Sequence, residues 1–228
     1  MASKALFITG TDTAVGKTVV SACLIKVLQG RGYRVAVAKP FESGANRDGA
    51  WLKYLTGQPS SWDGWAFPYR LKAALAPALA AEREGVQLSI PKVIAGLRRL
   101  EKQCDVLLVE GAGGALVPLG AGNTVADLIA KLGYSALVVA RLSLGTINHS
   151  LLTLEALRGR GCAVAGIVFN QSFYHALSEA EKLNPSVVAK LGQVRVLGQV
   201  PYLAKVHQQK LAGAAVLERY FVVKKLLK

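Results

Sequence analysis

Six short apolar segments recur along the chain, and each is nearly continuous in hydrophobic residues instead of alternating with polar ones. Strands that are buried on both faces have this pattern, whereas half-exposed strands alternate. We therefore expect six buried strands, at residues 5–10, 34–40, 105–111, 135–140, 162–170 and 194–201.

Helical patterns lie between these segments, at residues 17–29, 89–103, 124–133 and 147–161. Thr124 is a plausible N-cap, Gly133 a plausible end, and Pro91 suits the first turn of its helix. Strands that alternate with helices predict an α/β fold: a single-domain, mainly parallel sheet with helices on both faces. We expect this one domain to span residues 1–228.

Residues 40–70 are the irregular region, rich in Gly, Pro, Ser and Trp. Trp51, Trp62 and Trp65 all fall there. We expect them to pack a long excursion of the chain onto the core. A lid over a site is the alternative, which the sequence alone supports less.

The stretch "TGTDTAVGKT", Thr9–Thr18, joins the first predicted strand to the first helix. Gly16-Lys17-Thr18 at such a junction resembles a phosphate-binding loop, in which backbone N–H groups and the helix N-terminus receive phosphate oxygens. Lys17 would reach the β- and γ-phosphates, and the Thr18 hydroxyl would ligate Mg²⁺. Five residues separate Gly10 from Gly16, one more than in the general pattern, which indicates an unusual subclass.

Polar residues follow several other predicted strands, where α/β sheets bind their ligands. Lys39, held extended before a proline, could stabilise charge on a phosphoryl group that is being transferred. Glu110 ends a buried run and needs a partner such as Mg²⁺. Asp48 is either a metal ligand or the N-cap of a helix. Asn170 is either a contact to an adenine edge or an ordinary loop cap.

Glycines add backbone freedom beside these residues. Gly111, Gly113 and Gly114 would allow close approach to a ligand. Ser43 and Gly44 either bind substrate or form a turn. The three histidines are isolated and no Cys/His cluster exists, so we assign no zinc.

The net charge of +14 raises the possibility of nucleic-acid binding. The basic end of the chain, however, mixes cations with apolar residues at helical spacing, which is more typical of the solvated face of a closing helix. No apolar run reaches the roughly 18 residues of a membrane span, and the first residues do not form a signal peptide. Three widely spaced cysteines predict buried thiols. We expect a cytoplasmic protein without a nucleic-acid or membrane partner.

Taken together, the motifs resemble the dethiobiotin synthetase family, in family order over about residues 5 to 203. They are "GTDTAVGKT", "KPFESG", "VEGAGGALVPL", "LGTINHSLLT", "GIVFN" and "GQVPYL". The resemblance implies a phosphate-loop fold and a reaction in which ATP, CO₂ and 7,8-diaminononanoate give dethiobiotin, ADP and phosphate. It implies a carbamate, then a carbamic-phosphoric mixed anhydride, then ring closure, in biotin biosynthesis.

The resemblance also implies roles for individual residues. Lys17 and Lys39 would be catalytic, and Thr18, Asp48 and Glu110 would hold Mg²⁺. ATP would be bound by Ala14, Val15, Gly16, Lys17, Thr18, Val19, Asp48, Glu110, Gly111, Ala112, Gly113, Asn170, Gln171, Pro201, Tyr202 and Leu203. The family works as a homodimer, and the substrate would contact Thr13 and Ser43 together with Gly145, Thr146 and Asn148 of the second copy.

Two positions depart from the family pattern. Ala14 stands where an acidic residue is frequent, and Ala78 stands where a histidine is common. Two other functions remain open. An amide-forming relative would need an extra amidotransferase domain, for which the chain has no room. A DNA-associated nucleotide switch would fit the charge, but such proteins usually carry a second lysine early in the loop, and Thr11–Ala14 has none.

Overall fold

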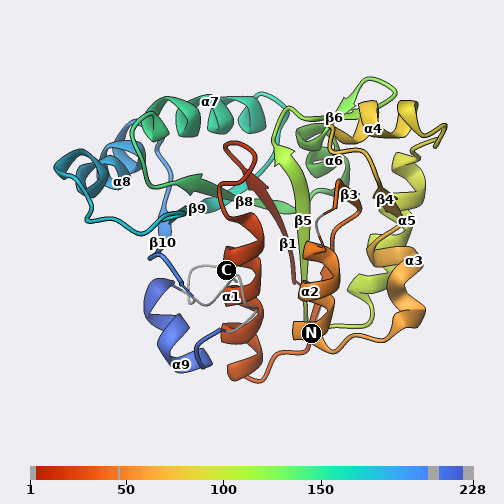
Figure 1. Cartoon of the computed structure of the whole chain (residues 1–228), viewed down its shortest axis with the longest axis horizontal. Helices are drawn as coiled ribbons and strands as arrows, with labels where there is room; N and C mark the ends of the chain where they lie inside the picture. The colour runs from red at the N-terminus through yellow and green to blue at the C-terminus, as the bar shows by residue number, and fades with distance from the viewer. Residues whose placement is uncertain (1–3, 46, 205–210, 223–228) are drawn as a thin grey trace.

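Six parallel strands form the main sheet, in the order β10-β9-β8-β1-β5-β2 (Figure 1). The structure is a computed structural model that describes residues 4–45, 47–204 and 211–222. The strands are β1 (Lys4–Gly10), β2 (Val35–Ala38), β5 (Val106–Gly114), β8 (Ser135–Arg141), β9 (Val164–Asn170) and β10 (Val196–Val200). All six predicted strands are present, so the predicted fold class is confirmed.

The four predicted helices are present too. They are α1 (Lys17–Gly30), α5 (Ile90–Glu101), α6 (Val125–Leu132) and α7 (Thr146–Arg158). Thr124 caps α6 through a reciprocal capping box with Asp127. A further helix, α8 (Glu179–Leu191), begins at a similar box between Ser178 and Glu181, and was not predicted because Pro185 interrupts its pattern.

The region between β2 and β5 is more regular than its composition indicates. It contains β3 (Phe41–Ser43), α2 (Asp48–Thr56), a 3₁₀ turn η1 (Ser60–Trp62), α3 (Asp63–Ala66), β4 (Tyr69–Leu71) and α4 (Pro77–Arg83). Trp51 is buried, and Trp62 and Trp65 pack against the core half-buried. The expected packing is therefore confirmed.

The remaining helices and strands are short. β6 (Pro118–Gly120) pairs with β7 (Asn123–Thr124) after β5. Near the end of the chain, α9 (Ala214–Leu217) packs on α1 and continues into a 3₁₀ turn η3 (Glu218–Tyr220). The closing helix predicted from "RYFVVKKLLK" begins as this 3₁₀ turn but does not continue through Phe221, which forms a β-bridge with Gly198. Residues 223–228 lie outside the described part.

The register of the sheet brings the predicted site residues to one edge. β1 lies between β5 and β8, with Ile8 opposite Glu110 and Leu137. Because all strands run in parallel, their carboxyl ends meet at the same edge as the loop after β1. Within the described residues, no helix has the length and apolar content needed to cross a membrane.

Candidate active site

The phosphate loop joins β1 to α1 in a strongly curved conformation. Gly16 has φ of +94° and Ala14 has φ of +56°, both in the left-handed region. The Lys17 ammonium turns back to donate a hydrogen bond to the Asp12 carbonyl at 3.3 Å. The N-cap residue of α1, Gly16, has no side chain that could cap the helix, so the first N–H groups of α1 are available to an anion. Ala14 adopts this curved backbone conformation with its side chain exposed, so the loop takes its shape without a carboxylate at this position.

A buried ion-pair network lies beside this loop. Lys39 Nζ is 2.7 Å from Asp48 Oδ2 and 2.8 Å from Glu110 Oε1. Glu110 is fully buried. Its carboxylate also accepts hydrogen bonds at 2.8 Å from the hydroxyls of Thr18 and Ser21. The network therefore brings together residues of α1, β5 and α2 with Lys39, which directly follows β2.

Asp48 does not cap its helix. It is the first residue of α2, and the preceding residue, Arg47, provides no side-chain cap either. The Asp48 carboxylate instead contacts Lys39. The N-cap interpretation of Asp48 is thus wrong, because the ion pair takes the carboxylate away from the helix start.

The two lysines respond differently to their surroundings. Burial lowers the pKa of Lys17, and the charge of Lys39 adds to this effect, although nearby carboxylates oppose it. Burial would also lower the pKa of Lys39, but the charges and hydrogen bonds of Glu110 and Asp48 outweigh it, so the pKa is raised. Both cations in one cavity provide a site for a highly charged anion.

The same oxygens suit a magnesium ion. Thr18, Asp48 and Glu110 present a hydroxyl and two carboxylates, the hard ligands that Mg²⁺ prefers. In this structure the Lys39 ammonium lies between the two carboxylates, so they already accept one cation. Within the described residues, no group of three His, Cys, Asp or Glu side chains could hold a metal alone. The donor set therefore fits an ion that takes its remaining ligands from phosphate and water.

A cavity of about 470 Å³ opens over these groups. Its walls contain predicted residues: Thr13, Ala14, Gly16, Lys17, Thr18, Val19, Lys39, Ser43, Asp48, Glu110, Gly111, Ala112 and Gly113. Val15 is buried behind the loop instead. Sequence reasoning missed Phe41, Glu42, Arg47 and Trp51, which also line the cavity. It also missed Ser21, which could have been found from its spacing of three residues after Thr18 on the same helix face.

The residues assigned to the nucleotide base lie at the ends of β9 and β10, outside this cavity. Asn170 is buried, and its amide donates hydrogen bonds to the Val15 carbonyl at 3.0 Å and to Ser172 at 3.3 Å. Gln171 is joined to β10 through the Val200 carbonyl. Pro201, Tyr202 and Leu203 follow β10 and are half-buried. Asn170 thus connects this edge to the phosphate loop.

Gly145, Thr146 and Asn148 are not brought into the cavity. They start α7, where Gly145 has φ of +87°. A second hollow of about 380 Å³ lies between the outer face of α7 and the phosphate loop. His149, Leu152 and Thr153 line one wall, and Thr11–Thr13 line another. Thr13 borders both hollows.

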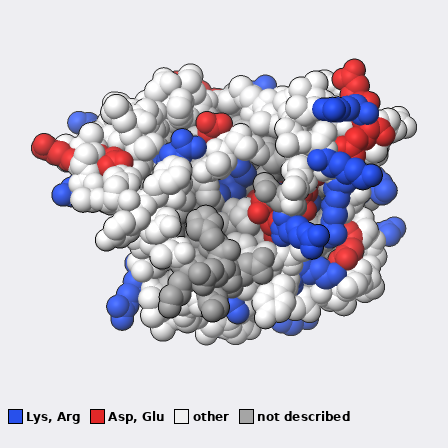
Figure 2. All heavy atoms as spheres, in the orientation of Figure 1, with Lys and Arg blue, Asp and Glu red and all other residues white. Residues whose placement is uncertain are grey.

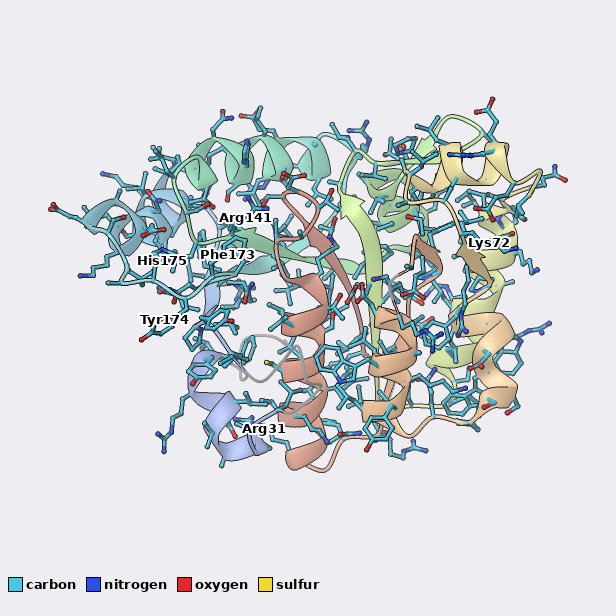
Figure 3. The ribbon with its side chains drawn as sticks, in the orientation of Figure 1. Arg31, Lys72, Arg141, Phe173, Tyr174 and His175 are labelled. Carbon is cyan, nitrogen blue, oxygen red and sulfur yellow. The ribbon has the colours of Figure 1, made fainter. Side chains whose placement is uncertain are left out.

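Arg141 is a further residue that sequence reasoning missed. It ends β8 beneath α7, and its guanidinium donates a hydrogen bond to the Thr13 carbonyl at 3.3 Å (Figure 3). The Nε atom is buried and has no partner within the described residues. This contact holds the outer turn of the phosphate loop against the sheet.

Known proteins match both the sequence and the fold. The AAA domain family matches residues 4–210. The ATP-dependent dethiobiotin synthetase of Anaeromyxobacter sp. (strain K) is 40% identical over 211 residues, covering 87% of this chain and 90% of the relative. That of Bacillus subtilis (strain 168) is 37% identical, covering 90% of each. The chain belongs to the dethiobiotin synthetase family.

Solved structures show the fold alone. The cell division ATPase MinD of Pyrococcus furiosus aligns with a TM-score of 0.59 at 18% identity, covering 95% of each chain. The MinD protein of Pyrococcus horikoshii in complex with Mg-ADP aligns with a TM-score of 0.61 at 17% identity, covering 98% of this chain and 88% of the other. Because the relatives named above are ATP-dependent dethiobiotin synthetases, the protein is an ATP-dependent ligase of biotin biosynthesis. Mg²⁺ is the usual partner of the nucleotide in phosphate-loop enzymes.

Proposed function

We propose that this enzyme carboxylates and cyclises 7,8-diaminononanoate with CO₂ and ATP to dethiobiotin, ADP and phosphate. The observation that carries the proposal is the pairing of Lys17 and Lys39, both 7% exposed, in one cavity with Thr18, Asp48 and Glu110. Such a site can stabilise two anions that must meet, a triphosphate and a carbamate.

The reaction has three steps in this proposal. One amine of the substrate attacks CO₂ and loses a proton, which forms a C–N bond and gives a carbamate. A carbamate oxygen then attacks the γ-phosphorus, and the P–O bond to ADP breaks. Finally the second amine attacks the carbonyl carbon of the mixed anhydride, phosphate leaves, another proton is lost, and the cyclic urea closes.

Each lysine has a distinct part in the proposed chemistry. Lys17, which projects from the loop, would bind the β- and γ-phosphates. Lys39 would offset negative charge on the carbamate oxygen and on the transferring phosphoryl group. Thr18, Asp48 and Glu110 would hold Mg²⁺, whose charge would neutralise part of that of the phosphates. Ser43 and Thr13, which both line the cavity, would contact the substrate.

The base of ATP would lie at the ends of β9 and β10. There the Asn170 Oδ1 oxygen is the atom that could accept a hydrogen bond from an amino group of adenine, because its Nδ2 is occupied by the Val15 carbonyl. Gln171 and Pro201–Leu203 would provide the remaining contacts.

A homodimer would complete the substrate site. The second hollow and its surroundings expose apolar side chains, with Leu116 54% and Leu152 56% exposed. Exposed apolar groups of this kind are typical of interfaces. Gly145, Thr146 and Asn148 of the second copy would then receive the substrate carboxylate at the start of α7.

The first prediction is a set of reactant dependencies. Because transfer needs the carbamate, ADP release should require both 7,8-diaminononanoate and bicarbonate, and labelled carbon from bicarbonate should appear in the product. Lys102 is exposed and does not line the cavity. As a control for the effect of replacing a lysine, Lys102→Ala should show the same reactant dependencies as the parent. ADP release that is independent of the diamine would contradict the proposal.

A further inference from the structure

Glu42 is a buried carboxylate in the wall of the reaction cavity, with 6% of its surface exposed. Its Oε1 atom accepts a hydrogen bond from the backbone N–H of Gly49 at 2.9 Å. Gly49 is the second residue of α2 and directly follows Asp48. The bond therefore joins strand β3 to the helix turn that carries Asp48.

The start of α2 depends on this external partner. The first N–H groups of a helix have no acceptor within the helix. Here Arg47 supplies no side-chain cap, and the Asp48 carboxylate is engaged with Lys39. Glu42 provides an acceptor from outside the helix, and its negative charge also suits the positive end of the helix dipole.

Glu42 itself is fixed in place. β3 pairs with β4, with Glu42 opposite Arg70. Next to it, the rings of Phe41 and Tyr69 stack with centroids 5.5 Å apart. The strand that carries Glu42 is thus held against β4 in two ways, through the backbone and through the aromatic pair.

The approach of the helix to Glu42 is close. A Cβ atom on Gly49 would lie 3.0 Å from the Phe67 ring and 3.3 Å from Glu42 Oε2. Glycine at this position lets the helix start pack against the strand. The joint therefore fixes the backbone directly after Asp48.

We propose that Glu42 is a positioning residue, which holds the first turn of α2 so that the Asp48 carboxylate faces the metal and Lys39. This inference rests on the metal role proposed for Asp48. Glu42 acts through the Gly49 N–H group and does not itself bind the ion or the substrate amine.

Three variants test the assignment. Glu42→Ala removes the acceptor. Glu42→Asp keeps the charge but shortens the side chain, and stands in if the alanine variant does not fold. Glu42→Gln keeps an oxygen that can accept the Gly49 N–H hydrogen bond.

The measurements are the binding of Mg²⁺ in the presence of ADP by calorimetry, the Mg²⁺ dependence of turnover, and the exchange rate of the Gly49 amide hydrogen in metal-free protein. Loss of a group that orients a metal ligand commonly weakens metal affinity by about 10- to 100-fold. We expect a weakening of this size in Glu42→Ala and Glu42→Asp, with faster Gly49 exchange and an unchanged KM for the diamine. Glu42→Gln should keep the Mg²⁺ affinity and the exchange rate of the Gly49 amide near those of the parent.

The outcomes separate this inference from the proposed function. Asp48→Ala is measured in parallel, and an unchanged Mg²⁺ affinity there would overturn the metal role of Asp48. If Asp48→Ala weakens Mg²⁺ binding but Glu42→Ala and Glu42→Asp do not, the positioning role is wrong. A Glu42→Gln variant with a raised KM for the diamine and normal Gly49 exchange would overturn it as well, because Glu42 would then act on the substrate by its charge.

Discussion

The two ends of the proposed ATP site are built in different ways. At the phosphate end, Lys17, Lys39 and Glu110 are buried side chains, and Lys39 and Glu110 form an ion pair at 2.8 Å. Beside the base end, where the Tyr174 ring centroid lies 5.9 Å from that of Tyr202, Phe173 and Tyr174 are 69% and 87% exposed. Figure 3 shows both residues, with His175, on the loop between β9 and α8 at the outer edge of the molecule.

The difference follows from what each end must recognise. Charge that develops during phosphoryl transfer needs dipoles and charges that are already in place. A nucleobase offers an apolar face, which exposed rings can meet without fixed charges. In Figure 2, Lys and Arg gather, mixed with Asp and Glu, on the side of α2, α3 and α4, and further charged residues lie on the side of α8. We infer that the phosphate end determines the rate and the base end tunes affinity.

The largest expected effect is at the phosphate end. Lys39→Ala should lower kcat by at least about a thousandfold, because it removes a charge aimed at the transferring group. It should also cost about 3 kcal/mol of unfolding free energy, since Glu110 stays buried without its cation. Turnover and thermal unfolding measure the two losses.

A double variant separates chemistry from stability in this prediction. Lys39→Met combined with Glu110→Gln removes both charges of the buried pair, which is often tolerated when both partners are replaced. We expect the double variant to recover stability relative to Lys39→Met alone, while turnover stays absent. Substantial activity in Lys39→Ala or in Lys39→Met would contradict the role of Lys39.

An intermediate effect is expected where the two ends meet. A Cβ atom on Gly16 would clash with the Asn170 side-chain amide, and Gly16 also has φ of +94°. Gly16→Ala should therefore separate the phosphate loop from β9 and raise the KM for ATP by about a hundredfold, the effect of roughly 3 kcal/mol of combined strain and lost contact.

The matched control is Gly32→Ala. Gly32 has φ of +83°, but a Cβ atom there meets no atom of the described residues within 4 Å. It should show the cost of a left-handed alanine, roughly 1–2 kcal/mol of stability, with an unchanged KM for ATP. If both variants affect KM equally, the contact between Gly16 and Asn170 is not what couples the two ends.

The sequence predicted the phosphate end far better than the base end. Lys17, Lys39 and Glu110 could be placed because parallel strands bring their carboxyl ends to one edge, and each residue follows or ends a strongly apolar strand. Glu42 could not be placed from the sequence, because its role depends on the packing of β3 against α2. Both elements lie within a stretch that looks irregular in composition. Asp48 could be placed on a helix start, but only the structure shows that its carboxylate turns to Lys39.

The loop after β9 had no comparable signal. The loop after β9 is held by local contacts, such as that of Gln171 Nε2 with the His175 carbonyl at 2.8 Å. Contacts between side chains and nearby backbone leave no periodic pattern in a sequence. α8 was missed for a related reason, since its capping box precedes a pattern that Pro185 interrupts.

The smallest expected effect is a pH dependence of the base end. His175 Nε2 lies 2.9 Å from Glu181 Oε1, and this hydrogen bond raises the pKa of His175 above its usual 6.5. The pKa of Glu181 is lowered to about 2, first by the backbone N–H of Ser178 and then by His175. The charged pair is therefore complete below pH 6.5 and is lost as the pH rises through the raised pKa of His175. At acidic pH the pair is lost as well, because Glu181 becomes protonated as the pH falls from 4.5 towards 2.

His175→Gln tests this dependence, because glutamine can keep a hydrogen bond to Glu181 but does not titrate. Between pH 6 and pH 9 the parent should show a rise of about twofold in the KM for ATP, small because an exposed pair is screened by solvent. The variant should show less of this rise, while kcat, set at the phosphate end, follows the same profile in both proteins. A KM profile that is identical in parent and variant would show that the His175 pair does not influence the base end. A change confined to kcat would instead mean that the loop after β9 acts on the chemistry, and the division between the two ends would not hold.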